Sequence, residues 1–223
     1  MRHLPTAVLT FDLMMTRLLP TIETISALAA RNDSEALNML GEATGASDEF
    51  VRRMAVESIG RHALGRSLDK QIVASLQDTS GYVARTACDV VASWQLVEAH
   101  DAVLALLKDS SAATRQSAIR ALHAIWTDTD FTVLFALSSN DPDIGVRREA
   151  MFVLRHHAAI ETWRALFDEL HGDDLPRHRR WACELAEAFA DVTPPPLLQL
   201  SSDPDGHVRK SATRAIDRIV ART

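Results

Sequence analysis

Aspartate and arginine recur in this chain at a fixed separation, and such charged pairs can serve acid–base catalysis or hold a structure together. The clearest case is the stretch 141–150, Asp-Pro-Asp-Ile-Gly-Val-Arg-Arg-Glu-Ala, which returns with few changes at 203–212. Asp141 and Arg147 are six residues apart, too far for an ion pair between i and i+4 on one helix. Because the pattern repeats along the chain, we interpret it as structural and not as a catalytic group.

Residues that commonly carry catalysis or bind metals do not gather in this sequence. His156 and His157 are adjacent and therefore point in different directions, and the other histidines are scattered. The chain has no Cys-x-x-Cys, no glycine-rich phosphate loop and no Gly-x-Ser-x-Gly. The sequence thus shows no enzymatic machinery, and we expect neither a cofactor nor a metal.

The stretch 141–150 has the local features of a helix start. Asp141 is predicted as the N-cap, and Pro142 suits the first helical position because its missing N–H is not needed there. Val146 and Ala150 would then lie one turn apart on one face.

This helix start belongs to an internal repeat. Alanines anchor six units with spacings of 32, 31, 32, 32 and 30 residues. In five of the six units an aspartate stands nine positions before the alanine. In five of the six units an arginine stands three positions before it. The anchors are Ala55, Ala87, Ala118, Ala150, Ala182 and Ala212; the aspartates are Asp78, Asp109, Asp141, Asp173 and Asp203; the arginines are Arg52, Arg115, Arg147, Arg179 and Arg209.

Each unit contains two apolar-periodic segments and no β-branched alternation, which predicts an all-α chain of helical hairpins. Helix A begins after the aspartate and runs for about four turns. Helix B is shorter and precedes the next aspartate, at about 68–77, 101–108, 131–138, 160–170 and 195–201. One hairpin cannot bury its apolar face alone, so the units must stack on their neighbours.

Residues 1–45 fit the repeat poorly and are predicted as an N-terminal helical cap or degenerate repeat. Helices are expected at 7–19, 21–31 and 34–41, and residues 46–223 are expected to form one continuous domain. The alternative for the N-terminus is a partner-binding patch made by Phe11, Leu13, Met14 and Met15. At the other end the last helix A has no helix B after it, which would leave an edge for docking.

The Asp-Pro-Asp…Val-Arg-x-x-Ala runs resemble the HEAT family and, within it, the PBS-lyase HEAT-like repeats. The resemblance covers about residues 46–223. It implies a right-handed α-solenoid, an α-α superhelix of about six hairpins. It also implies that each of the five repeated arginines reaches the aspartate-bearing turn of the neighbouring unit. We call these repeated aspartates and arginines the structural ladder. Ala84 replaces the arginine in the second unit and His178 replaces the usual valine in the fifth, so these units are expected to pack differently.

Enzymes that share such repeats supply two alternatives. One is a subunit resembling the bilin lyases, which would need a deep pocket. The other resembles the HEAT-like alkylpurine DNA glycosylases, which use aromatic residues and an acid in a groove. In this chain Trp163 and Asp168, beside Arg164, could imitate those groove residues. The paired His-Glu motifs of HEAT-type deoxyhypusine hydroxylases are absent here, which excludes that di-iron interpretation.

Composition limits the partner. The 223 residues carry a net charge of −6, which disfavours a nucleic-acid binder that depends on phosphate neutralisation. Cys88 and Cys183 stand at the same repeat position three units apart and are interpreted as small core residues without a disulfide. No apolar run is long enough for a membrane span and no leader pattern is seen, so a cytoplasmic location is expected.

We therefore predict a non-catalytic scaffold or adaptor that holds another protein on the concave surface of the solenoid, at its ends, or on both. In HEAT proteins the B helices usually line that surface. The polar B-helix residues assigned to it are Lys70, Asp101, Thr132, Arg164 and Asp168.

Overall fold

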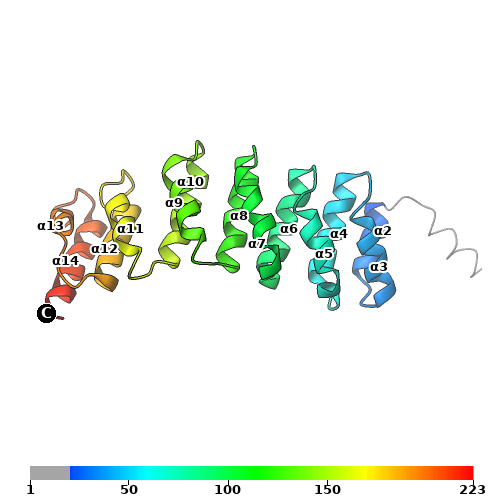
Figure 1. Ribbon diagram of the computed structural model, residues 1–223, viewed down its shortest axis with the longest axis horizontal. Helices are drawn as coiled ribbons and strands as arrows, with labels where there is room; N and C mark the ends of the chain where they lie inside the picture. Colours follow the sequence, from blue (N-terminus) through cyan, green and yellow to red (C-terminus); the bar gives the residue numbers. More distant parts are fainter. Residues whose placement is uncertain (1–20, 223) are drawn as a thin grey trace, which may run out of the picture. The chain divides into compact units, whose positions relative to one another are not determined.

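The computed structural model describes residues 21–222, which form helices and contain no strand. The expected helix at 7–19 and the patch around Phe11 lie outside the described residues. The chain divides into two compact units, Met1–Asp130 and Phe131–Thr223, and each is described by itself. Within each unit helical hairpins follow one another in chain order (Figure 1). The fold class is thus all-α, a solenoid of helical hairpins, as predicted.

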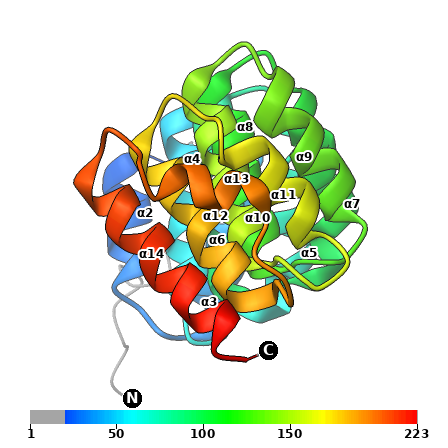
Figure 2. The same cartoon turned by 90° about the vertical axis from the view of Figure 1, so that its left-hand side faces the viewer.

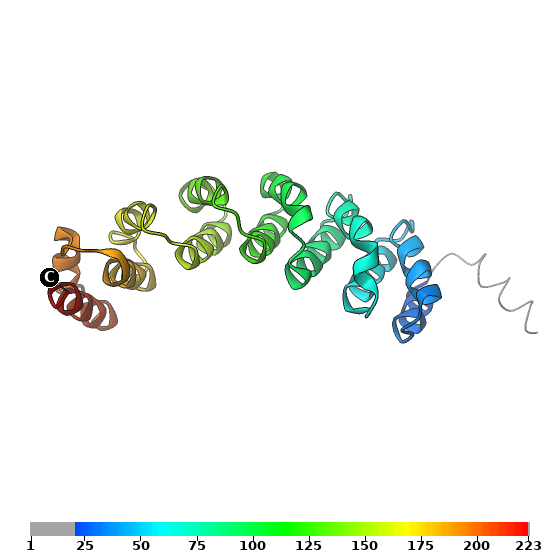
Figure 3. The same cartoon turned by 60° about the horizontal axis from the view of Figure 1, so that its bottom comes forward.

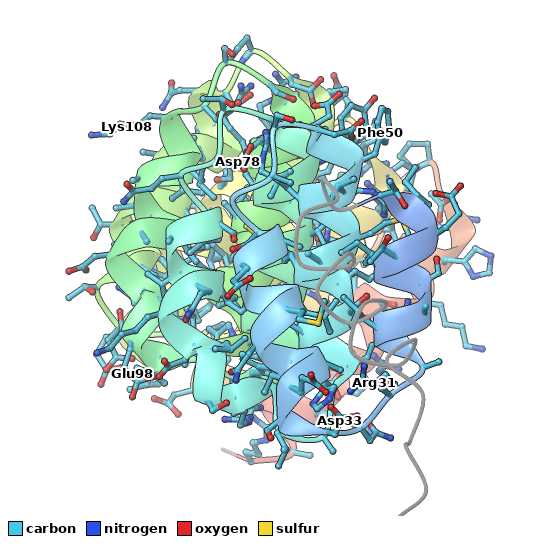
Figure 4. All side chains as sticks on the ribbon, turned by 90° about the vertical axis from the view of Figure 1, so that its right-hand side faces the viewer. Arg31, Asp33, Phe50, Asp78, Glu98 and Lys108 are labelled. Carbon is cyan, nitrogen blue, oxygen red and sulfur yellow. The ribbon has the colours of Figure 1, made fainter. Side chains whose placement is uncertain are left out.

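The first unit opens with a hairpin of two short helices, α2 (Ile22–Ala29) and α3 (Ser34–Ala43). Thr21 and Asp33 cap these helices by accepting hydrogen bonds from backbone N–H groups of the first turn. At the turn between them Arg31 Nε donates to Asp33 Oδ2 at 2.9 Å, and both side chains lie close together in Figure 4. Both helices fall in the segments predicted for the cap.

Helices A of the units are 13 to 15 residues long. They are α4 (Glu49–Arg61), α6 (Gly81–Trp94), α8 (Ala112–Ala124), α10 (Ile144–His156), α12 (Pro176–Phe189) and α14 (Gly206–Val220).

Helices B are shorter and in the first unit continue into turns of 3-10 helix. They are α5 (Asp69–Ser75), preceded by η1 (Gly65–Leu68); α7 (His100–Ala105), flanked by η2 (Val97–Ala99) and η3 (Leu106–Lys108); α9 (Asp130–Asn140); α11 (Trp163–Leu170); and α13 (Pro195–Leu200). Figure 3 shows the second unit nearly end on, with α11 and α13 in one layer and α12 and α14 in the other. Figure 2 shows α13 packed against α14 at the end of that unit.

The anchor alanines mark the places where helices A approach their neighbours. All six have an exposed fraction of 0%. A methyl side chain lets two helix backbones come close while the flanking apolar side chains interdigitate. The valine of each run is equally buried where it occurs, with Val51, Val83, Val146 and Val208 at most 2% exposed.

The predicted helix start at Asp141 is wrong by two residues. Helix α10 begins at Ile144, and its N-cap is Asp143, whose carboxylate accepts from the N–H of Val146 at 3.0 Å. Asp205 caps α14 in the same way. Pro142 precedes the helix, and Asp141 accepts from the N–H of Asp143 at 2.8 Å. The first aspartate therefore closes the turn, and the second caps the helix.

Candidate functional site

The ladder arginines all make one kind of contact inside their own unit. The Nη1 atom of each donates to the backbone carbonyls six and five residues earlier, as Arg179 does to Asp173 at 2.7 Å and Asp174 at 3.0 Å. The same pair of bonds forms at Arg52, Arg115, Arg147 and Arg209. Each arginine thus fixes the turn before its own helix. The six-residue spacing between aspartate and arginine is the sequence signal of this contact. The sequence-based prediction concerned pairing between side chains and did not include the bonds to backbone carbonyls.

In the first unit the opposite edge of the guanidinium reaches the next repeat. Arg52 Nε donates to Asp78 Oδ2 at 2.7 Å and Nη2 to Oδ1 at 2.8 Å. The two side chains are 14% and 11% exposed. The hydrogen bond from Arg52 lowers the pKa of Asp78 below its ordinary value. This bidentate pair joins the start of α4 to the start of α6.

The second unit contains an equivalent pair between α12 and α14. Arg179 Nε donates to Asp203 Oδ2 at 2.7 Å and Nη2 to Oδ1 at 2.9 Å. Asp203 is more deeply enclosed, with 4% of its side chain exposed. The bond from Arg179 lowers the pKa of this carboxyl group as well.

The ladder stays open between α10 and α12 in the same unit. Among the described residues no carboxylate bonds to Arg147. Its Nη1 atom donates to backbone carbonyls, and its Nε and Nη2 atoms make no hydrogen bond there. The aspartate expected there, Asp173, instead places Oδ2 2.9 Å from His178 Nδ1, although the alignment does not make a hydrogen bond. Its Oδ1 accepts from the N–H of Leu175 at 2.7 Å. His178, the residue that replaces the usual valine, therefore takes the place of the arginine beside Asp173.

The other departure from the repeat has a simpler result. In the second repeat Ala84 stands where the ladder arginine is expected, so this position of α6 has no guanidinium for Asp109. Among the described residues the Asp109 carboxylate makes only its turn contact, accepting from the N–H of Ser111 at 2.7 Å.

All five side chains assigned to the partner-binding surface are exposed. Lys70 lies on α5 and Asp101 on α7 in the first unit, while Thr132 lies on α9 and both Arg164 and Asp168 on α11 in the second. Figure 4 shows Glu98 and Lys108, which flank α7, projecting outward from the first unit. These positions within each unit match the predicted exposure, and their role in binding stays a prediction.

Comparison with family models identifies this architecture. One model for HEAT repeats matches residues 69–155, and a second matches a HEAT repeat at residues 195–222. The chain belongs to the HEAT-repeat family. A comparison with curated protein sequences finds no match.

Solved structures with similar folds include natural and designed repeat proteins. The Escherichia coli protein YibA is 16% identical with a TM-score of 0.60, covering 98% of this chain and 99% of its own. An archaeal HEAT-like repeat protein from Thermococcus onnurineus is 18% identical with a TM-score of 0.54, covering 89% of this chain and 93% of its own. Computationally designed armadillo repeat proteins for modular peptide recognition are 17% identical with a TM-score of 0.61, covering 82% and 99%. At these identities the likeness shows the fold.

The cysteines of this HEAT protein are enclosed. Cys88 and Cys183 are both free thiols with an exposed fraction of 0%. Burial raises the pKa of each thiol to about 12. The thiolate that would bind a metal or attack an electrophile is therefore scarce at neutral pH.

Histidines and tryptophans in the HEAT units are mostly packed against neighbours. His100 Nε2 lies 2.8 Å from the carboxylate of Asp130, whose side chain is 1% exposed. Trp163 is buried against Phe167 with Arg164 over its ring, whereas Asp168 is exposed one turn further on. Within residues 21–222 no group of three or more His, Cys, Asp or Glu could hold a metal.

Among the helices of residues 21–222, none is long and apolar enough to cross a bilayer.

Proposed function

We propose that this HEAT protein is a non-catalytic scaffold or adaptor that holds a partner protein on the exposed surface of its B helices. The observation that carries the proposal is a row of exposed side chains at one register of the repeat. Lys70, Asp101, Thr132 and Arg164 follow one another in the sequence at intervals of 31 or 32 residues, one on each of the first four helices B.

The neighbouring positions support a contact surface. Four residues after the first three members of the row stand Ala74, Ala105 and Ala136, and all three are exposed. Since residues four apart lie on the same side of a helix, each of these three B helices presents one variable side chain beside a small one. A methyl side chain at these positions lets a partner approach the helix closely. Solenoids use such repeated faces for extended binding.

Related architectures are consistent with this proposal. The designed armadillo proteins of similar fold are described as made for modular peptide recognition, and the present chain shares with them stacked helical repeats. Apolar side chains beside the row add contact area: Val97 is 57% exposed before α7, and Val133 is 42% exposed on α9. Both are large enough to contribute to a partner interface.

Site-specific photo-crosslinking tests the proposal in cells. A benzoylphenylalanine residue would replace Ala74 in the first unit or Ala136 in the second. Matched controls would replace Ala113 on α8 and Ala188 on α12, which are exposed alanines on helices A. The proposal predicts that both B-helix positions crosslink one and the same protein, and that the controls do not. Equal crosslinking from helices A and B would contradict it.

A further inference from the structure

A cavity of about 410 Å³ lies inside the second unit where α10 and α12 begin. Its walls include Ile144, Arg147, Arg148 and Met151 from α10, with Asp173 and His178 from the turn and first residues of α12. It occupies the place where the ladder is open. At the closed contact between α12 and α14 the corresponding arginine and aspartate join the two helix starts.

Two arginines of this cavity lack an acidic partner among the described residues. Arg147 uses only Nη1, for the carbonyls of Asp141 and Pro142, so its Nε and Nη2 edge remains available. Arg148 contributes an Nε atom that is buried without a hydrogen-bond partner. A buried guanidinium N–H without an acceptor is costly, and an anion in the cavity would relieve that cost.

The repeat itself shows which anion fits such an arginine edge. In Arg52 and Arg179 the same Nε and Nη2 atoms hold a carboxylate in a bidentate pair at 2.7–2.9 Å. Planar bidentate geometry of this kind matches a carboxylate group.

Acidic residues in the same walls narrow the choice of ligand. Glu169, Asp173 and Asp174 also line the cavity, and they would repel a doubly charged phosphate more strongly than a single carboxylate. The apolar side chains of Ile144, Met151 and Leu175 would suit a short aliphatic group attached to the anion.

We propose that this cavity binds an aliphatic carboxylate, with Arg147 holding both oxygens through Nε and Nη2 in the role that the aspartate of the next repeat has at Arg52 and Arg179. The site lies at the helix starts of α10 and α12, and it is independent of the row of side chains on helices B. The carboxylate can come from a small free acid or from a glutamate side chain of a peptide, and the two sources share this chemistry.

Nuclear magnetic resonance of the arginine Nε–Hε groups tests the site directly in the full chain. The probes are glutarate and the capped peptide N-acetyl-Leu-Glu-Leu-amide, with N-acetyl-Leu-Gln-Leu-amide as the uncharged control. The expected result is a saturable shift of the Arg147 signal by glutarate, by the glutamate peptide or by both, and no shift by the glutamine peptide. Binding of glutarate as tight as that of the peptide would identify a free acid as the source. Binding of the peptide alone would identify a glutamate side chain.

Matched variants separate this site from general arginine binding. Arg147→Gln should weaken binding of the active probe by about tenfold or more, since a charge-assisted pair is lost. Arg209→Gln is the control, because Arg209 makes the same two carbonyl bonds but lines no part of this cavity. Arg148→Gln provides a second test if Arg147→Gln does not fold, and it should weaken binding too.

Two results would overturn the proposal. One is an Arg147 signal that neither glutarate nor the glutamate peptide shifts. The other is binding that appears only in Asp173→Asn, because this would mean that Asp173 already occupies the arginine edge in solution.

Discussion

Two successive helix A pairs in the second unit, α12 with α14 and α10 with α12, differ in their ladder connection. Between α12 and α14, Arg179 holds Asp203 with both of its outer nitrogens. Between α10 and α12, Arg147 stands at the same repeat position, yet Asp173 lies against His178. At the open contact histidine stands at position 178 in place of the usual valine, beside Asp173. The turn contacts of Arg147 and Asp173 are kept there, so the helix starts form without the pair between repeats.

The largest effect is expected where the closed pair is broken. Arg179→Ala should lower the free energy of unfolding by about 3–5 kcal/mol, because it leaves a nearly enclosed carboxylate without its partner. Urea unfolding followed by circular dichroism measures the change. Arg209→Ala is the matched control and should cost about 1 kcal/mol, since the exposed Arg209 loses its two carbonyl bonds but no aspartate. Equal costs for the two variants would mean that the pair adds no stability.

The open contact should be less sensitive to the same substitution. Arg147→Ala is expected to cost about 1–3 kcal/mol, because the carbonyls of Asp141 and Pro142 lose their donor while no carboxylate is stranded. The same urea measurement applies. A cost as large as that of Arg179→Ala would show that Arg147 has an acidic partner in solution.

Acid should weaken the closed contact selectively. The lowered pKa of Asp203 means that the unfolded state takes up protons first, so stability is lost as pH falls below about 4 towards the folded pKa. The loss is at most about 1.4 kcal/mol per pH unit for this group.

Comparison with Asp203→Asn isolates that contribution. The stability difference between the natural chain and Asp203→Asn should be constant above about pH 5 and shrink as pH falls towards 3. A difference that stays the same over this range would contradict the assignment.

Restoring the valine of the repeat should close the open contact. His178→Val removes a buried ring whose Nδ1 and Nε2 make no hydrogen bond, and it frees Asp173 to meet Arg147. We expect a gain of about 1 kcal/mol in the free energy of unfolding. The Arg147 Nε–Hε signal should also shift to the position of a carboxylate-bound arginine. An unchanged signal together with lower stability would show that His178 is needed for packing.

Much of the fold could be predicted because a repeat samples the same environment several times. Alanine in six equivalent places indicates a position where helices approach, and each of those alanines proves to be fully buried. The helix start was less predictable, because either aspartate of an Asp-Pro-Asp run can cap a helix. The structure uses the second for the cap and the first for the turn, and local preference alone does not distinguish them.

The open ladder contact at Arg147 could not be predicted from the sequence, for a different reason. His178 could be recognised as a departure from valine, but its contact with Asp173 depends on where two side chains from one turn meet. The unused edge of Arg147 and the cavity lie beside that contact. The exposure of Lys70 and the other B-helix residues was easier to predict, because it depends only on which face of its helix each residue occupies.

The carboxylate of the next repeat is bound at Arg179 and unbound at Arg147, and double-mutant cycles test this difference most directly. One cycle combines Arg179→Ala with Asp203→Ala, and the other combines Arg147→Ala with Asp173→Ala. We predict a coupling energy of about 1.5–3 kcal/mol for the first pair and less than about 0.5 kcal/mol for the second. Equal coupling energies in the two cycles would contradict the account.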